Sequence, residues 1–187
     1  MGSKIPATLP AKGDKPAADG RYYYFAKGAS INNVTITAGM NVTIVGTTTS
    51  LSGLTVGTNA TCAIYIDGAI NASSQGSLNN NNWAGALQIF TTTTSSCTVS
   101  GNGELRASVY APYASLKASG GGTSGSVVGS YVAKTITATG QMSFHYDEAL
   151  RRLYTGGGGG WALTKWFELQ SSGDRSTVDA LTANFLP

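Results

Sequence analysis

Short runs of β-branched residues, separated by Gly, Asn and Ser, follow one another from Ile31 to Tyr146. Each run is too short for a helix, and its apolar residues alternate with small polar ones, as in a strand with one buried face. No amphipathic helix is predicted between them. The pattern therefore predicts an all-β domain with strands at 34–37, 42–45, 54–56, 63–66, 87–90, 97–99, 105–110, 127–128 and 131–136.

The spacing of these runs fits two architectures. Most begin roughly 8–12 residues apart, as in an antiparallel sandwich of hairpins or in the successive turns of a parallel coil. The breaks at 57–59 and 101–103 are rich in Gly and Asn, which tolerate positive φ at sharp corners, and two-residue hairpin signals are scarce. We therefore predict a right-handed parallel β-solenoid, with an antiparallel β-sandwich as the alternative.

Composition divides the chain into three parts. Residues 1–20 carry three prolines and no hydrophobic period, so we expect a flexible leader or linker. Residues 21–153 contain the predicted solenoid. Residues 154–187 begin with a glycine-rich connection and continue with Trp161, Leu163 and Phe167. We expect this last part to form a cap over an end of the coil, because solenoid ends otherwise expose unpaired backbone.

Charged side chains are scarce. The 12 Lys and Arg and the 9 Asp and Glu make 21 charged residues among 187, or 11%, where about 25% is usual. Between Lys27 and Glu104 the only Lys, Arg, Asp, Glu or His is Asp67. Like residues stack on neighbouring turns of a solenoid, so a charged position would repel itself. The net charge is +3 and no cluster of Lys and Arg is present, so we expect no binding of nucleic acid.

The sequence offers little catalytic chemistry. His145 and Asp147 would lie on one side of a strand and could orient a base, but we favour a structural explanation in which Phe144 and Tyr146 fill the core of the last turn. Asp147 and Glu148 are weak candidates for binding Ca²⁺, and no His or Cys cluster suggests zinc. We therefore expect no enzyme activity, no cofactor and no metal.

Three further sets of residues are candidates for specific roles. We favour a disulfide between Cys62 and Cys97, the only two cysteines. Turns of about 10–12 residues would place them some three turns apart, but the loop at 71–82 could bring them onto adjacent turns. The alternative is two small buried residues in separate turns. Trp83, in an Asn-rich loop, is a candidate surface contact. Alternating threonines could form a flat, uncharged array that binds ice or a polysaccharide; they include Thr35, Thr37, Thr135 and Thr137.

The second half of the chain resembles a bacterial envelope domain. The matching blocks are GELRASVYAPYASL at 103–116, GSYVAKTI at 129–136 and FHYDEAL at 144–150. In this order they resemble the C-terminal domain of PilX-like pilus-assembly and other prepilin-type proteins, and a weaker match extends over residues 19–150. The signature residues of the resemblance are Tyr110, Pro112, Lys134, His145, Tyr146 and Asp147.

The resemblance implies a β-solenoid-like domain displayed at the bacterial cell surface, with no activity established for the family. We therefore expect a structural or adhesive domain of a pilus-like or surface assembly, whose partners are other subunits, including copies of itself. The alternative is an extracellular module that binds ice or polysaccharide through its Thr/Ser/Asn-rich face. The prepilin-type apolar N-terminal helix of such proteins is not in this sequence, so we expect membrane contact only through a missing N-terminal segment.

Overall fold

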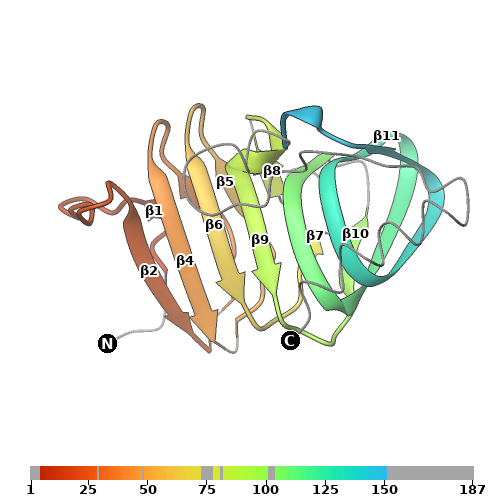
Figure 1. The fold of residues 1–187 in the computed structure, drawn as a ribbon, viewed down its shortest axis with the longest axis horizontal. Helices are drawn as coiled ribbons and strands as arrows, with labels where there is room; N and C mark the ends of the chain where they lie inside the picture. The colour runs from red at the N-terminus through yellow and green to blue at the C-terminus, as the bar shows by residue number, and fades with distance from the viewer. Residues whose placement is uncertain are drawn as a thin grey trace, which may run out of the picture. The chain divides into compact units, whose positions relative to one another are not determined.

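The chain forms a parallel β-solenoid, which confirms the predicted fold and not the sandwich. The computed structural model describes residues 5–28, 30–47, 49–72, 78–80, 82–100 and 104–150. Parallel strands stack into a coil of about five turns with essentially no helix. The strands that face the viewer in Figure 1 run downward while the chain advances to the right, so the coil is right-handed.

The described strands form two sheets. The smaller sheet has the order β1-β3-β5-β8, and the larger has the order β2-β4-β6-β9-β11-β10-β7. A single turn of 3-10 helix, η1 (Ala84–Ala86), precedes β9. The strands are β1 (Thr8–Leu9), β2 (Tyr22–Lys27), β3 (Val34–Ile36), β4 (Asn41–Thr47), β5 (Leu54–Val56), β6 (Thr61–Ile66), β7 (Asn71–Ala72), β8 (Leu78–Asn80), β9 (Leu87–Thr91), β10 (Cys97–Ser100) and β11 (Glu104–His145).

One turn of the coil takes about twice as many residues as the strand spacing suggested. Tyr22 pairs with Val42 and Val42 with Cys62, so each of these turns takes 20 residues. Cys62 pairs with Leu87, so the next takes 25. The expected turn of about 10–12 residues was wrong. Alternation with period 2 marks each strand but does not reveal how many strands make a turn.

Inward side chains stack in columns that form the core. One column contains Ile44, Ile64, Ile89 and Val109, which hold equivalent positions on β4, β6, β9 and β11. The first three are fully buried, and Val109 is nearly so. Burial of a large aliphatic side chain contributes about 1.5–3 kcal/mol, so every added turn extends the same source of stability.

Strand β11 passes from one part of the larger sheet to another. Ser108 to Tyr110 pair with β9, whereas Leu116 to Ser119 pair with β10. The later part of β11 lies against the earlier part. One hydrogen bond between them runs from the Tyr131 hydroxyl to the Leu105 carbonyl oxygen at 3.1 Å. The hydroxyls of Thr135 and Ser115 are also bonded, at 2.9 Å. Strand β11 thus closes the described end of the coil.

The predicted flexible leader is instead part of the fold. Thr8 and Leu9 form β1, which pairs with β3, and Leu9 is completely buried. The Tyr24 hydroxyl donates to Asp14 at 2.5 Å. Burial, together with this bond, raises the pKa of Tyr24 to about 12. The prediction failed because the leader supplies so few core residues that no hydrophobic period is visible among its prolines.

The expected disulfide is absent, since Cys62 and Cys97 are both free and buried. Cys62 lies inward on β6 between Val42 and Leu87. Cys97 lies on β10, where its sulfur accepts a hydrogen bond from the Ile70 amide at 3.4 Å. Burial raises the pKa of the Cys62 thiol to about 12. Both residues serve as small core side chains in different columns.

The C-terminal residues are not described beyond Leu150. The chain divides into the units Met1–Leu153 and Tyr154–Pro187, so the predicted cap lies outside the described residues. Within the described part, no helix has the length and apolar character needed to span a membrane.

Close contact between turns makes Gly68 a sensitive position. A Cβ atom there would lie 2.1 Å from the Thr49 carbonyl oxygen on the preceding turn. We expect Gly68→Ala to lower the free energy of unfolding by about 2–3 kcal/mol, as overpacking does. Gly39→Ala is the matched control, because Gly39 has a positive φ of 75° but open space around it; its cost should be about 1 kcal/mol. Equal losses in urea denaturation would contradict the close stacking.

The leader's role in the core can be tested at Leu9. Leu9→Ala should lower the free energy of unfolding by about 2–4 kcal/mol, because it leaves a cavity in the first turn. The neighbouring Thr8 is exposed, so Thr8→Ala should change stability by less than about 0.5 kcal/mol. If thermal unfolding of the two variants is the same as that of the wild type, the leader is not part of the core.

Candidate binding face

The outer face of the larger sheet carries a row of apolar side chains. Strand register aligns Phe25 with Val45, Val45 with Tyr65, Tyr65 with Phe90, and Phe90 with Tyr110. We call these five residues the aromatic row, although Val45 is aliphatic. The row crosses β2, β4, β6, β9 and β11, which lie side by side in Figure 1. It therefore runs along the axis of the coil.

The aromatic row is open to solvent at several positions. Phe25 is 75% exposed, Tyr110 is 50% exposed and Tyr65 is 44% exposed. The rings of Tyr65 and Phe90 stack with centroids 4.8 Å apart and planes 7° apart. Such stacking follows from the parallel register, because it places equivalent side chains one strand spacing apart. The register therefore brings the Tyr65 and Phe90 rings together.

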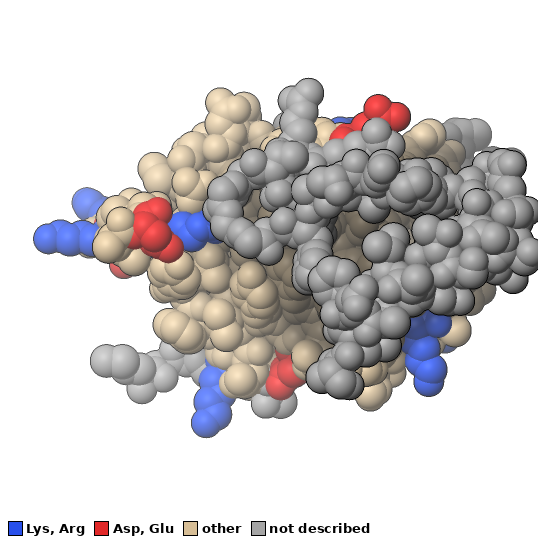
Figure 2. Space-filling model, viewed as in Figure 1, with Lys and Arg blue, Asp and Glu red and all other residues tan. Residues whose placement is uncertain are grey.

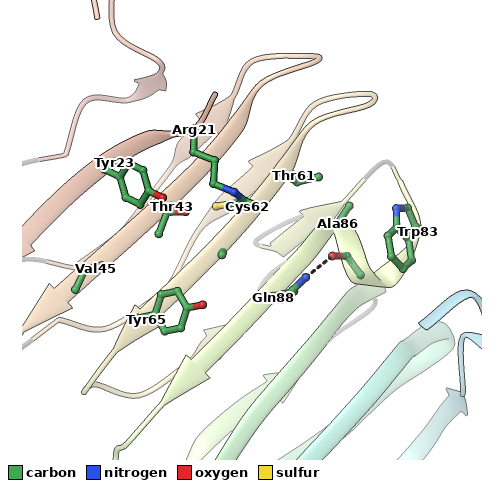
Figure 3. Close-up of a pocket in the computed structure, with 12 residues that line it drawn as sticks. Arg21, Tyr23, Thr43, Val45, Thr61, Cys62, Tyr65, Trp83, Ala86 and Gln88 are labelled. Atoms are coloured by element: carbon green, nitrogen blue, oxygen red, sulfur yellow. Dashed lines mark hydrogen bonds between the residues drawn. The ribbon is translucent and has the colours of Figure 1, made fainter. Parts of the chain in front are cut away.

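A groove of about 550 Å³ lies on one side of the aromatic row. We call it the Trp83 groove. In Figure 3, Tyr23 and Trp83 lie at opposite sides of this groove, with Thr43 and Thr61 between them. Small residues, among them Thr61 and Ala63, line the groove between these two rings. Its lining comprises Arg21, Tyr23, Thr43, Val45, Thr61, Cys62, Ala63, Tyr65, Trp83, Gly85, Ala86 and Gln88.

A second groove, of about 510 Å³, lies along the other side of the row. We call it the Tyr113 groove. Val45 and Tyr65 line both grooves, so the two form one continuous surface across the sheet. The Tyr113 groove is lined by Val45, Gly46, Thr47, Tyr65, Ile66, Asp67, Phe90, Thr91, Thr92, Tyr110, Pro112 and Tyr113.

Trp83 is held in place by its neighbours. It precedes η1, and its ring covers Gly85 so closely that a Cβ atom on Gly85 would lie 2.2 Å from the ring. The Asp147 carboxylate accepts hydrogen bonds from the Ala84 amide at 2.8 Å and from the Ala149 amide at 3.0 Å. The last signature block thus fixes the start of η1. Trp83 remains 37% exposed, as a partly buried wall of its groove.

Each groove contains a single charged residue. These are Arg21 in the Trp83 groove and Asp67 in the Tyr113 groove, where an Asp67 oxygen accepts the Thr49 amide hydrogen bond at 3.0 Å. In Figure 2 most of the described Lys, Arg, Asp and Glu lie toward the margins, and most of the visible described surface between them is uncharged. Taken together, the two linings contain one positive and one negative side chain and therefore have no net charge.

Neutral hydrogen bonds join successive turns at the surface. The pairs are Ser30 with Ser50 at 2.9 Å, Thr61 with Asn41 at 2.6 Å, and Thr98 with Asn71 at 3.1 Å. Each pair joins residues on adjacent turns. This arrangement supplies the physical reason for the low charge, because hydroxyl and amide groups can both donate and accept, whereas stacked like charges repel.

The predicted threonine candidates do not form one array. Thr35 lies on β3, aligned with Thr8 and Thr55 on the outer face of the smaller sheet. Thr37 follows β3 and is exposed. Thr135 and Thr137 lie on β11, and Thr135 bonds to Ser115. The threonines thus belong to separate sheets, and the longest aligned set among the described threonines on the smaller sheet contains three.

The candidates of the last signature block are mostly at the surface. Phe144 and Tyr146 are 43% and 58% exposed, so the expectation that they fill the core was wrong. His145 and Glu148 are exposed, and both Asp147 oxygens bond to backbone amides. Within the described residues, no three His, Cys, Asp or Glu are close enough to hold a metal ion. A catalytic or calcium role for this block therefore gains no support.

The other signature residues differ in position. Tyr110 and Pro112 line the Tyr113 groove, whereas Lys134 is exposed on β11 outside both grooves. Sequence reasoning missed the aromatic row itself. Its signal was the interval of 20 residues from Phe25 to Val45, from Val45 to Tyr65 and from Phe90 to Tyr110. That interval has meaning only once the length of a turn is known.

No curated protein and no solved structure matches the sequence. The family described as a domain of unknown function (DUF7305) matches residues 4–153. This match spans the coil and the leader that packs into it, which is most of the 187 residues, and the chain therefore belongs to the DUF7305 family.

Proposed function

We propose that the chain is a non-enzymatic structural or adhesive domain of a bacterial surface assembly, of the pilus-like type. The observation that supports this proposal best is the aromatic row. Contiguous exposed apolar side chains on a soluble domain mark contact sites, and Phe25, Tyr65 and Tyr110 are each at least 44% exposed. A solenoid suits such a role because it presents a long, regular surface.

The chemistry of the exposed face favours contact over catalysis. The groups that line the two grooves are mainly aromatic rings, methyl groups and threonine hydroxyls. Glycosidic hydrolysis generally requires a pair of carboxylates on either side of the scissile bond. Asp67 is the single carboxylate in the lining of these grooves. The face is suited to holding a partner in place.

The proposed location is the outside of the bacterial cell, and the proposed partners are other subunits, including copies of this chain. This location is supported by the resemblance to PilX-like proteins of residues 103–116, 129–136 and 144–150. The neutral surface agrees with it, because a face without excess charge can make extended contacts without ladders of repelling groups.

A second candidate function is binding of ice or polysaccharide by threonines. It is favoured by the aligned Thr8, Thr35 and Thr55 on the outer face of the smaller sheet. This set spans only three strands, and its neighbour on β8 is Asn79. The aromatic row crosses five strands, so we place the main contact surface on the larger sheet.

Surface display can be tested in the source cells. Antibodies against the full chain should label intact cells, and a photo-crosslinking residue at Tyr65 should attach the chain to a surface protein or to a second copy. The same residue at Thr35 is the control and should crosslink much less. Labelling only after the cells are permeabilised, or equal crosslinking from both positions, would contradict the proposal.

A further inference from the structure

The aromatic row has a gap at Val45. Phe25 and Tyr65 lie on either side of Val45 in the strand register. Adjacent strands are about 4.8 Å apart, so the backbone positions of Phe25 and Tyr65 are roughly 9.6 Å apart. Tyr65 and Phe90 show that rings on adjacent strands stack here. The short Val45 side chain therefore leaves room for one flat ring between Phe25 and Tyr65.

The side of this gap formed by Val45 and Tyr65 lies where the two grooves meet, whereas Phe25 lines neither groove. Val45 and Tyr65 belong to both linings. From Tyr23 on β2 to Trp83 before β9, the Trp83 groove crosses the strands (Figure 3). The Tyr113 groove continues past Phe90 to Tyr110 on β11. A ligand that fills both must be elongated and lie along the axis of the coil.

The lining indicates the chemistry of that ligand. Aromatic rings provide apolar platforms. Polar side chains beside them are Thr61 and Gln88 in one groove and Thr47 and Thr92 in the other, while Thr43 is buried. Sites of this kind orient a ligand by a few polar groups on an apolar base. The one positive and one negative residue match a ligand without net charge, and give no basic track for a nucleic acid or an acidic polymer.

We propose that this face binds a linear, uncharged polysaccharide along the axis of the coil, with one sugar ring in the gap above Val45. Sugar rings combine an apolar face with hydroxyl groups at their edges, as this surface requires. The inference rests on the proposed function as a surface contact domain, and it names the ligand class of the same face. Adhesion would then be to a neutral glycan.

Asp147 acts on this site as a positioning residue. The Asp147 carboxylate accepts a hydrogen bond from the Ala84 amide and so fixes the position of η1. The Trp83 ring packs against Gly85, which belongs to η1. Loss of the carboxylate should therefore loosen the Trp83 wall without removing a group that contacts the ligand. Asp147→Ala should shift the Trp fluorescence and weaken binding severalfold, and Asp147→Asn should restore part of both, because its amide oxygen still accepts one hydrogen bond.

The test uses the full chain and purified polysaccharides. Affinity electrophoresis should be run in gels that contain linear β-1,4-glucan, β-1,3-glucan, xylan or mannan, with alginate as the anionic comparison. Val45→Phe closes the gap and should leave the fold intact, since it completes the aromatic row. Tyr65→Ala removes one wall of the gap. The matched controls are Val132→Phe and Tyr146→Ala, at exposed positions outside both grooves.

We expect at least one neutral polysaccharide to retard the wild type. Val45→Phe and Tyr65→Ala should each weaken that retardation at least tenfold, and the two controls should stay within twofold. The proposal is overturned if no neutral polysaccharide is bound, if alginate binds better, or if Thr35→Val abolishes binding while Val45→Phe does not. If Tyr65→Ala instead alters self-association in sedimentation, the face joins copies of the chain. That result would overturn glycan binding but leave surface display, tested on cells, standing.

Discussion

Parallel, in-register stacking of the turns is the constraint on which the rest of the structure depends. Each described strand of the larger sheet places its residues directly against equivalent residues of its neighbours, as in Val42, Cys62 and Leu87. A side chain that suits one turn must therefore suit its copies above and below. Aliphatic residues satisfy this condition inside the coil, where they form buried columns. On the outer surface, in-register stacking favours side chains that interact well with a similar side chain on the next turn.

Two kinds of outward group meet that condition here. Hydroxyl and amide side chains bond across turns, as Asn41 and Thr61 do at 2.6 Å. Aromatic rings stack, as Tyr65 and Phe90 do at 4.8 Å. Lys, Arg, Asp and Glu would repel their neighbours at the same spacing. The scarcity of charge between Lys27 and Glu104 is thus a consequence of the register, and the aromatic contact surface arises from the same cause.

Local patterns predicted the fold better than they predicted the site. Alternating runs such as 42–45 and 63–66 gave the strands, because one buried face imposes period 2. The length of a turn was wrong, because it depends on how strands are distributed around the coil. Leu9 was missed for a related reason: a single core residue has no period. The aromatic row stayed hidden because its members are adjacent only across turns, and the role of Asp147 depends on a contact with Ala84, which is 63 positions away.

The most direct measurement of this account is a double-mutant cycle across two turns. Asn41→Asp and Thr61→Asp place carboxylates at positions that pair in the register. Each single variant should lower the free energy of unfolding in urea only slightly. The reason is that the unchanged Thr61 or Asn41 side chain can still donate a hydrogen bond to the new carboxylate. The double variant should lose about 1 kcal/mol more than the sum, from repulsion between like charges about 5 Å apart. That excess should shrink in 1 M salt, where the Debye length is about 3 Å. Additive losses that salt does not change would contradict the claim that stacking in register excludes charge.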